Sequence, residues 1–270
     1  MIESSSNAQI KYLRRLVKNS RFRKAERVFI VEGFKMVFEA VSYNLVVKIY
    51  ATLQAAEQER EEYRKIFLLA KEKGLAVELV NDKVFSGICD TASPQGVLAV
   101  VKMPEYHLED YTNVTGKSGN RLKFLCLEDI SDPGNLGTMM RTAEGAGMTG
   151  VIMSKKTADL FNPKVVRATM GSLFRVPFFY RENFVETIQY LKSKQVAIYA
   201  AHLQGSVPYD KVSYNGSIGI LIGNEANGLS GEVTALADTC IRIPMAGQLE
   251  SLNAAVSAAL LMYETGRNKG

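Results

Sequence analysis

The chain has 270 residues, 47% of them hydrophobic and 23% charged, and its formal net charge is +5. This length and composition allow two ordinary α/β domains or one large one, and they exclude disorder as the default state. No apolar run approaches the roughly 20 residues that a bilayer-spanning helix needs, and residues 1–10 are polar where a secretory signal would be apolar, so we expect a soluble protein of the cytoplasm.

The first predicted element is a basic amphipathic segment near the N-terminus. Between residues 11 and 27 the only acidic residue is Glu26. The basic residues of this segment, which we call the basic stripe, are Lys11, Arg14, Arg15, Lys18, Arg21, Arg23, Lys24 and Arg27. Such a stripe attracts a phosphate backbone and releases its counterions, although a solvated helix face is the better explanation when the stripe is taken alone.

The rest of the first hundred residues alternates helical and extended patterns. Helices are predicted near Gly33–Val41 and from about Glu57 to Lys73. Strands are predicted at Val46–Tyr50, Ala76–Val80 and Gly96–Lys102. We therefore expect a small α/β domain over residues 1–102.

Residues 103–120 lack periodicity and have the composition of a linker. Pro104, Gly116, Ser118 and Gly119 stand among scattered polar residues there. We place a domain boundary in this segment, so that a second domain covers residues 121–270.

The second domain reads as alternating strands and helices. Strands are predicted at Lys123–Glu128, Gly150–Met153, Val196–Ala201, Ile218–Ile222 and Cys240–Ile243. Helices are predicted at Leu136–Ala146, Phe184–Ser193 and Leu252–Glu264. This alternation indicates a mostly parallel sheet with helices on both faces, and such sheets bind ligands at the carboxyl ends of their strands.

One glycine motif in this domain is misleading. Residues 145–150 match the G-x-G-x-x-G spacing of dinucleotide-binding folds. That fingerprint follows a strand and opens a helix, whereas this one follows a predicted helix and leads into a predicted strand. The glycines are better explained as a helix C-cap and a tight turn.

The cysteines and histidines indicate neither a disulfide bond nor a metal site. Cys89, Cys126 and Cys240 lie far apart and form no C-x-x-C pair, so we expect reduced residues of the core. His107 and His202 are the only histidines, and neither lies in a motif, so no metal site is predicted.

Three segments of small, polar and turn-forming residues each follow a predicted strand. They are Asp132–Gly137 with Arg141, Gly223–Ser230, and Ile243–Gly247 followed by Ser251–Asn253. Taken singly, these segments are explained by a Pro-Gly turn, an Asn-Gly hairpin turn and a serine N-cap.

Together, in this order, the three segments resemble the signature motifs of the SpoU/TrmH family of RNA ribose 2′-O-methyltransferases, within the SPOUT class. The motifs stand here at Asn135–Ala143, Ile222–Leu229, and Ile243–Met245 with Ser251–Ala259, and the resemblance covers residues 121–268. It implies S-adenosylmethionine as cofactor, a homodimer, and a parallel sheet whose C-terminal segment is threaded as a trefoil knot, an exception to the rule that chains do not thread themselves.

The first domain is similar to the N-terminal RNA-binding domain of the same family. Residues Phe29–Gly33 and Ser93–Val97 carry this weaker match. With this resemblance, we interpret the basic stripe as an RNA contact. The residues predicted to bind RNA are Lys11, Arg14, Arg15, Arg21, Arg23 and Lys24.

The resemblance also implies roles for individual residues. The catalytic set is Asn135, Arg141, Glu225, Ser251 and Asn253, and the cofactor set is Gly223, Asn224, Ile243, Met245 and Leu252. Arg141 takes the role of activating the 2′-hydroxyl. A guanidinium stays protonated, so stabilising the developing alkoxide or holding the adjacent phosphate is physically easier than acting as a base. For Glu225 the alternatives are to cap a turn or to pair with Arg141.

Other functions stay open at this level. A non-catalytic RNA-binding protein of the same fold is disfavoured because pure binding does not need this polar set, and methylation of a base nitrogen is disfavoured by the Ser251–Asn253 motif. Among RNA substrates, the added N-terminal domain favours ribosomal RNA of the 23S type over transfer RNA.

Overall fold

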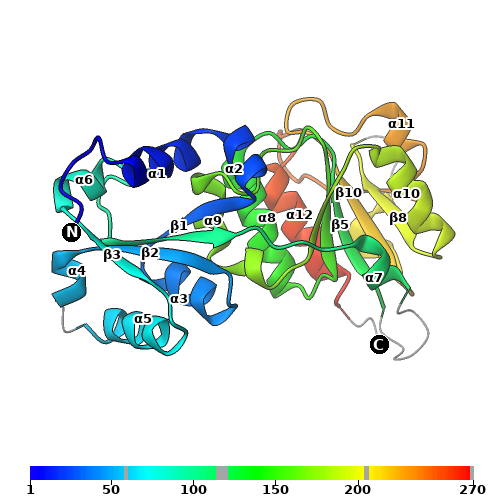
Figure 1. Cartoon of the computed structure of the whole chain (residues 1–270). Helices are drawn as coiled ribbons and strands as arrows, with labels where there is room; N and C mark the ends of the chain where they lie inside the picture. The colour runs from blue at the N-terminus through cyan, green and yellow to red at the C-terminus, as the bar shows by residue number, and fades with distance from the viewer. Residues whose placement is uncertain (58–59, 114–120, 204–206, 268–270) are drawn as a thin grey trace. The chain divides into compact units, whose positions relative to one another are not determined.

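The computed structural model describes residues 1–57, 60–113, 121–203 and 207–267 (Figure 1). The chain divides into two compact units, each described by itself below. The first unit consists of Met1–Glu105 with Asp159–Phe174, and the second of Tyr106–Ala158 with Arg175–Gly270. No helix within the described ranges is long and apolar enough to cross a membrane.

The first unit is built on a mixed four-stranded sheet in the order β1-β4-β2-β3. The strands are β1 (Val28–Glu32), β2 (Val46–Thr52), β3 (Val77–Val80) and β4 (Val97–Lys102). The helices are α1 (Ala8–Lys18), α2 (Ser20–Glu26), α3 (Phe34–Ser42), α4 (Leu53–Glu57), α5 (Glu61–Glu72), α6 (Asp82–Ser86) and α9 (Pro163–Thr169). The three predicted strands are confirmed. β1, a buried apolar run of only five residues, was not predicted.

Segment Asp159–Phe174, which contains α9, belongs to this first unit. The sequence places it with the second domain because it follows a strand of that domain. In the structure the ring of Phe161 packs against that of Phe29 on β1, with centroids 4.8 Å apart, and Phe174 lies 6.3 Å from Phe29. Burial of these rings joins the segment to a sheet that is distant in sequence.

The second unit is built on a parallel seven-stranded sheet in the order β7-β6-β5-β10-β8-β11-β9. The strands are β5 (Lys123–Leu127), β6 (Gly150–Ser154), β7 (Phe178–Arg181), β8 (Ala197–Ala201), β9 (Val207–Pro208), β10 (Ile218–Ile222) and β11 (Thr239–Arg242). All five predicted strands are present, whereas the short strands β7 and β9 were not predicted. The α/β class with a parallel sheet and a smaller N-terminal unit is confirmed. The trefoil knot stays a prediction from the resemblance.

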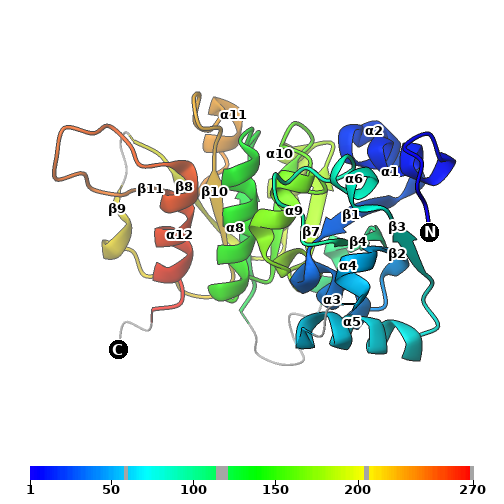
Figure 2. The same cartoon turned by 90° about the vertical axis from the view of Figure 1, so that its left-hand side faces the viewer.

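Helices cover both faces of the parallel sheet (Figure 2). They are α7 (Leu108–Thr112), α8 (Pro133–Gly145), α10 (Phe184–Ser193), α11 (Gly231–Thr234) and α12 (Ala254–Glu264). On one face, α10 packs on a core that includes Phe124 and Cys126 of β5. Figure 2 shows α8 and α12 side by side. Successive side chains of a strand point to opposite faces of the sheet, and helices bury both faces of β5. Apolar residues are therefore needed at successive positions, which explains its continuous hydrophobic run.

The segment predicted as a linker is partly folded. α7 lies within it, and Leu108 is completely buried in the core that α10 covers. Residues 114–120, the rest of the expected linker, lie outside the described residues. The interpretation of the glycine motif is confirmed, because α8 ends at Gly145 and Gly147 adopts a left-handed φ of 64° before β6 begins.

Candidate active site

Three loops leave the carboxyl ends of β5, β10 and β11, which lie close together in the parallel sheet. The loop after β5 leads into α8, whose N-cap Asp132 accepts a hydrogen bond from the backbone of Asn135 at 2.8 Å. The loop after β11 leads into α12, whose N-cap is Asn253. The carboxyl edge of the sheet thus collects the residues that the sequence singled out, as parallel topology requires.

Glu225, in the loop after β10, holds the turn that precedes α8. One carboxylate oxygen accepts hydrogen bonds from the Ser131 backbone at 3.0 Å and the Ser131 hydroxyl at 2.9 Å. The other accepts from the Asp132 backbone at 3.1 Å and from Asn135 Nδ2 at 3.0 Å. Of the two alternatives for Glu225, the structure therefore has the capped turn, and Arg141 is not among its hydrogen-bond partners.

These hydrogen bonds determine the charge state of Glu225. Burial alone would raise the pKa of the carboxyl group, but the hydrogen bonds from Asn135 and from the backbone of Ser131 and Asp132 outweigh it and hold the pKa at about 2. A carboxylate with so low a pKa is a poor proton acceptor near neutral pH. Glu225 is therefore suited to orienting the loops rather than to acting as a general base.

A chain of side-chain amides extends this arrangement to the third loop. Because Glu225 only accepts, Asn135 must turn its Nδ2 toward it, which leaves Asn135 Oδ1 to accept from Asn253 Nδ2 at 3.0 Å. Asn253 Oδ1 in turn accepts from the first backbone amides of α12, at Ala255 (2.9 Å) and Val256 (3.3 Å). Three predicted catalytic residues, separated by up to 118 positions, thus form one polar chain.

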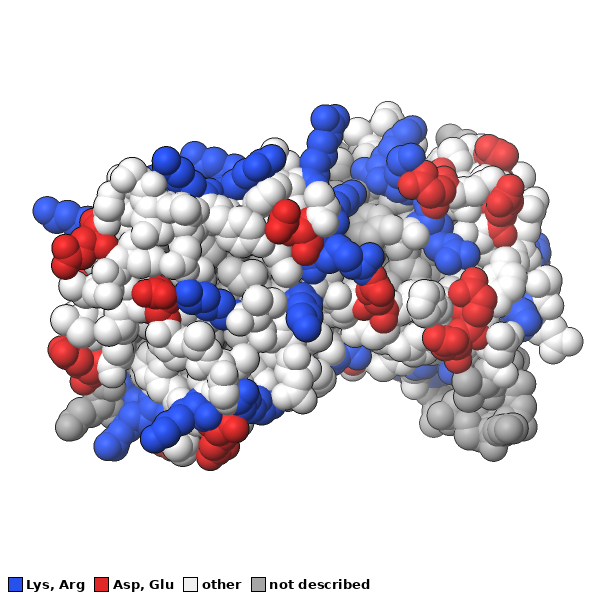
Figure 3. Space-filling view, viewed as in Figure 1, with Lys and Arg blue, Asp and Glu red and all other residues white. Residues whose placement is uncertain are grey.

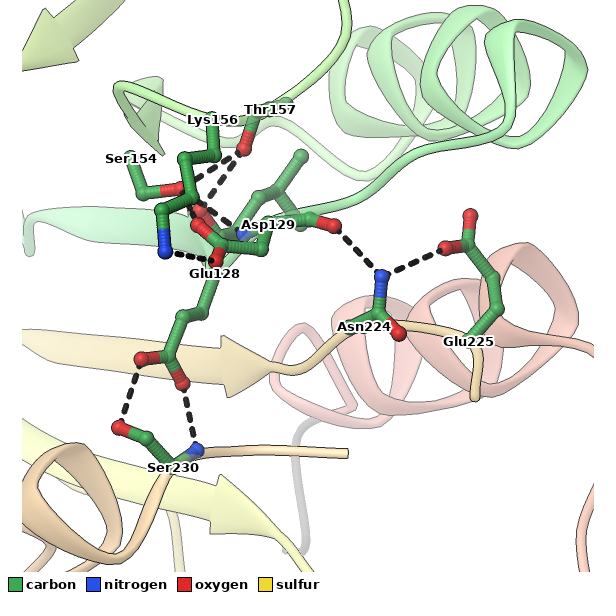
Figure 4. Close-up of polar contacts among 9 residues, drawn as sticks. Glu128, Asp129, Ser154, Lys156, Thr157, Asn224, Glu225 and Ser230 are labelled. Atoms are coloured by element: carbon green, nitrogen blue, oxygen red, sulfur yellow. Dashed lines mark hydrogen bonds and ion pairs between the residues drawn. The ribbon is translucent and has the colours of Figure 1, made fainter. Parts of the chain in front are cut away.

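The backbone of Asp129 adopts a left-handed conformation, with φ of 55°, at the end of this edge (Figure 4). Its backbone amide donates to Ser154 Oγ at 2.8 Å, and that hydroxyl donates to Asp129 Oδ1 at 2.6 Å. Asn224 Nδ2 donates to the Asp129 carbonyl at 2.8 Å. An unfavourable φ held by side chains from a neighbouring strand, β6, and from the loop after β10 is a feature that clusters at functional sites.

Glu128 makes a contact that could not be predicted from the sequence. Its carboxylate accepts from the Ser230 hydroxyl at 2.7 Å and the Ser230 backbone at 2.8 Å, which ties the far end of the loop after β10 to β5 (Figure 4). The same loop is tightly folded at its start, because a Cβ on Gly223 would lie 2.1 Å from the Gly228 carbonyl carbon. The loop is therefore fixed at its beginning, middle and end.

A cavity of about 490 Å³ lies between the loops after β8, β10 and β11. Its lining includes the predicted residues Gly223, Asn224, Glu225, Ile243, Met245, Ser251 and Leu252. Asn135, Asn253 and Arg141 are outside the lining. His202 and Leu203 line the cavity although no motif marked them. Their position directly after a central strand was the available signal.

Arg141 stands apart from the polar chain. It is exposed on α8 and, within the described residues, makes no hydrogen bond or ion pair. Six residues of helix separate it from Asn135, about 9 Å of rise and about 240° of rotation, so the two side chains leave the helix in different directions. It shares a helix face with Gly145, and a Cβ on Gly145 would lie 2.8 Å from the hydroxyl of Tyr263 on α12.

Comparison with known proteins places this geometry in a family. The SpoU rRNA Methylase family matches residues 123–263, a range that holds all three loops. The chain belongs to the SpoU rRNA methylase family. The resemblance seen in the sequence is thereby confirmed.

Relatives of the methylase match it over nearly its whole length. The 23S rRNA (guanosine(2553)-2′-O)-methyltransferase RlmP of Bacillus subtilis is 33% identical over 97% of each chain. An AdoMet-bound rRNA methyltransferase from Sinorhizobium meliloti superposes with a TM-score of 0.85, at 31% identity over 99% of this chain and 97% of that one. The methyltransferase AviRb from Streptomyces viridochromogenes, in complex with AdoMet, has a TM-score of 0.83, at 26% identity over 96% and 97% of the two chains.

The N-terminal part of the methylase has its own match, to the MRM3-like substrate binding domain, over residues 7–99. The basic stripe lies on α1 and α2 of this part, and Figure 3 shows Lys and Arg side chains gathered along α1. Six of its members are exposed: Lys11, Arg15, Lys18, Arg21, Lys24 and Arg27. The stripe is therefore available to a polyanion, as expected.

Of the other two members of the basic stripe, Arg14 is half-buried and Arg23 is buried, and the assignment of Arg23 to the RNA-binding surface was wrong. Its side chain is only 2% exposed, because its guanidinium donates to the last carbonyls of α1, at Leu16 (2.6 Å) and Val17 (3.0 Å), and pairs with Asp159 at 2.5 Å. A buried arginine is held by partners of this kind. Arg23 thus joins α1 to segment Asp159–Phe174 within the first unit.

Proposed function

We propose that this chain methylates a ribose 2′-hydroxyl in ribosomal RNA of the 23S type, with S-adenosylmethionine as the methyl donor. The observation that carries the proposal is the polar chain from Glu225 through Asn135 to Asn253 at the edge of the cavity, in a chain of the SpoU rRNA methylase family. RlmP is a 23S rRNA 2′-O-methyltransferase by name and aligns with 97% of this chain, which supports the choice of substrate.

The cavity fits the proposed cofactor. Its volume of about 490 Å³ lies in the range of small-molecule sites, and its lining combines apolar walls with a few polar groups. Ile222, Ile243, Leu252 and Leu261 offer an apolar surface to an adenine ring. Glu225, Glu250 and Arg242 are the charged residues of the lining, and the two acidic residues give it a net negative charge, which suits a ligand that carries positive charge.

The polar chain and Arg141 would have different roles in methyl transfer. When bound, S-adenosylmethionine supplies a methyl group on a positively charged sulfur whose departure needs no acid. The protein then has to orient the 2′-hydroxyl and stabilise the charge that develops on it. Glu225, Asn135 and Asn253 hold the loops, and the guanidinium of Arg141 stabilises the developing alkoxide or holds the neighbouring phosphate.

We further propose a homodimer that covers the exposed side of α12. Val256, Leu260 and Tyr263 are 48%, 38% and 58% exposed, and their spacing puts them on one face of the helix. Such an apolar stripe on a surface helix is a candidate for burial against a second copy. Arg141 lies beside it, next to Gly145, so the dimer would place Arg141 at an interface near the second subunit's site.

The test is methyl transfer from labelled S-adenosylmethionine to unmodified 23S ribosomal RNA, with transfer RNA as the competing substrate. A 2′-O-methyl group blocks alkaline cleavage at its own linkage, so the label is expected in dinucleotides from the ribosomal RNA. Label in mononucleotides would mean base methylation, and label only in transfer RNA would refute ribosomal RNA as the substrate. The absence of label in both RNAs, with cofactor binding intact, would favour a non-catalytic binder. The proposal also places the protein in the cytoplasm.

A further inference from the structure

We propose that a second cavity, formed entirely within the first unit, binds one unpaired nucleotide of the RNA, with the base inside and its phosphate at Arg60. This inference rests on the proposed function, because it adds a recognition site for the same substrate. The cavity measures about 400 Å³. It is lined by the starts of α3 and α5, by α4 and α6, and by the turn at residues 94–96.

The floor of this cavity is rigid. Gly33 and Gly96 adopt positive φ angles of 89° and 75°. A Cβ on Gly33 would lie 2.5 Å from Gln95 Oε1, and one on Gly96 would lie 2.7 Å from Thr52 Oγ1. The two backbone turns and the Gln95 side chain therefore pack too closely to admit other residues, and the cavity is preformed.

The aromatic wall suits a base. The half-buried ring of Phe34 lies 6.4 Å from the ring of Tyr63, at 55° to it. The Tyr63 hydroxyl donates to the Gln95 carbonyl, which fixes that ring in place. Rings that line a pocket and cannot turn away are the platforms on which unpaired bases stack, and they do so for every base.

The polar groups of the cavity match a base and a phosphate together. Gln95 Oε1 accepts from the Phe34 backbone at 3.0 Å, which leaves the Gln95 amide hydrogens without a partner among the described residues. Asp82 supplies a carboxylate acceptor to the same lining. Arg60 is exposed and lines the same cavity as Tyr63, so it supplies a positive charge there. A donor, an acceptor, a ring and a cation fit a nucleotide better than a bare anion, which the Asp82 carboxylate would repel.

The cavity adjoins the basic stripe. Arg14 of the stripe donates from Nε to the carbonyl of Gly87 at 3.1 Å. Gly87 is the C-cap of α6, and Ser86, the last residue of that helix, lines the cavity. At Arg14, α1 therefore lies next to a helix that lines the cavity, so an RNA strand bound along the stripe could extend a base toward it.

The test uses the full-length protein and four probes, the monophosphates AMP, GMP, CMP and UMP, followed by the amide resonances of Gly33 and Gly96. At least one monophosphate should shift these resonances with saturation, and ribose 5-phosphate, which lacks a base, should not. Arg60→Gln and Phe34→Leu should each weaken the saturable binding about tenfold. Arg64→Gln, on the same helix but outside the lining, is the matched control and should leave it unchanged. Equal shifts with ribose 5-phosphate, or no shift with any monophosphate, would overturn the proposal.

Kinetics separate this inference from the proposed function. With unmodified 23S ribosomal RNA, Arg60→Gln should raise KM for the RNA about tenfold and leave kcat and S-adenosylmethionine affinity unchanged. An unchanged KM would refute the cavity as an RNA site. A wild-type protein that transfers no methyl group, yet still shows the saturable shifts, would refute the methylation while the nucleotide site stands.

Discussion

Replacing Glu225 by glutamine removes the centre of the polar chain while changing its volume little. The glutamine can keep one oxygen, but its amide group must then face either the two donors of Ser131 or those of Asp132 and Asn135. In either orientation the glutamine amide group faces one backbone N–H that cannot accept, so that hydrogen bond is lost, and the bonds that remain lose the charge of the carboxylate.

The size of the effect follows from these contacts. One net hydrogen bond contributes about 0.5–1.5 kcal/mol, and the weakening of the bonds that remain adds to it, so the free energy of unfolding should fall by about 1–2 kcal/mol. For a unit of this size that corresponds to a fall in Tm of about 2–8 °C. The displaced Asn135 and the loosened loop should lower kcat about 100-fold.

The assay combines thermal unfolding with hydrogen exchange, because two compact units need not unfold in one transition. Faster exchange is expected in the loop after β5 and in the loop after β10, both of which Glu225 contacts. Glu232→Gln, an exposed carboxylate on α11, makes the same change of charge and should alter stability by less than about 0.5 kcal/mol. A Glu225→Gln protein with unchanged exchange and unchanged kcat would refute the role given to the polar chain.

Four further outcomes are expected. Because the folded-state pKa of Glu225 is lowered from 4.5 to about 2, the stability it contributes is complete above about pH 4.5 and is lost as the pH falls toward 2, and urea unfolding of Glu225→Gln should lack that loss. Arg141→Ala should abolish methylation and keep the affinity for S-adenosylmethionine measured by calorimetry, whereas near-normal turnover would exclude Arg141 from the mechanism. Leu260→Asp should convert the dimer to a monomer in light scattering, and a wild-type protein that is already monomeric would refute the homodimer. Charge reversal at Arg15 and Arg21 should weaken RNA binding and lower the slope of log affinity against log salt concentration by about one for each lost phosphate contact. If the variant and the wild type have the same slope, the stripe is a solvated helix face and not an RNA contact.

Much of the fold could be predicted because its signals are local. The predicted strands of the second unit are short, largely apolar runs. The starts of α8 and α12 were predicted to within three residues, but the N-cap of α12 is Asn253 rather than the predicted Ser251. β1 and β7 could not be predicted, because four or five apolar residues are compatible with a strand or with a buried turn of helix until a neighbouring strand pairs with them.

The candidate site divides in the same way. The three loops could be located from sequence because small and polar residues follow strands. Their partners could not, since the bond between Asn135 and Glu225 joins residues 90 positions apart and that between Glu128 and Ser230 joins residues 102 apart. Nothing in the local sequence distinguishes Glu128 from an ordinary exposed carboxylate.

The sequence by itself determined most of the strands and helices and the three loops, because each depends on residues that are neighbours along the chain. Only the tertiary structure decided the long-range contacts. It buried Arg23 against Asp159, left Arg141 exposed, and turned the Asn135 amide toward Glu225. The physical reason is that the free energy of a charged or amide group depends on the solvent and partners around it, and distant segments of the chain supply those partners.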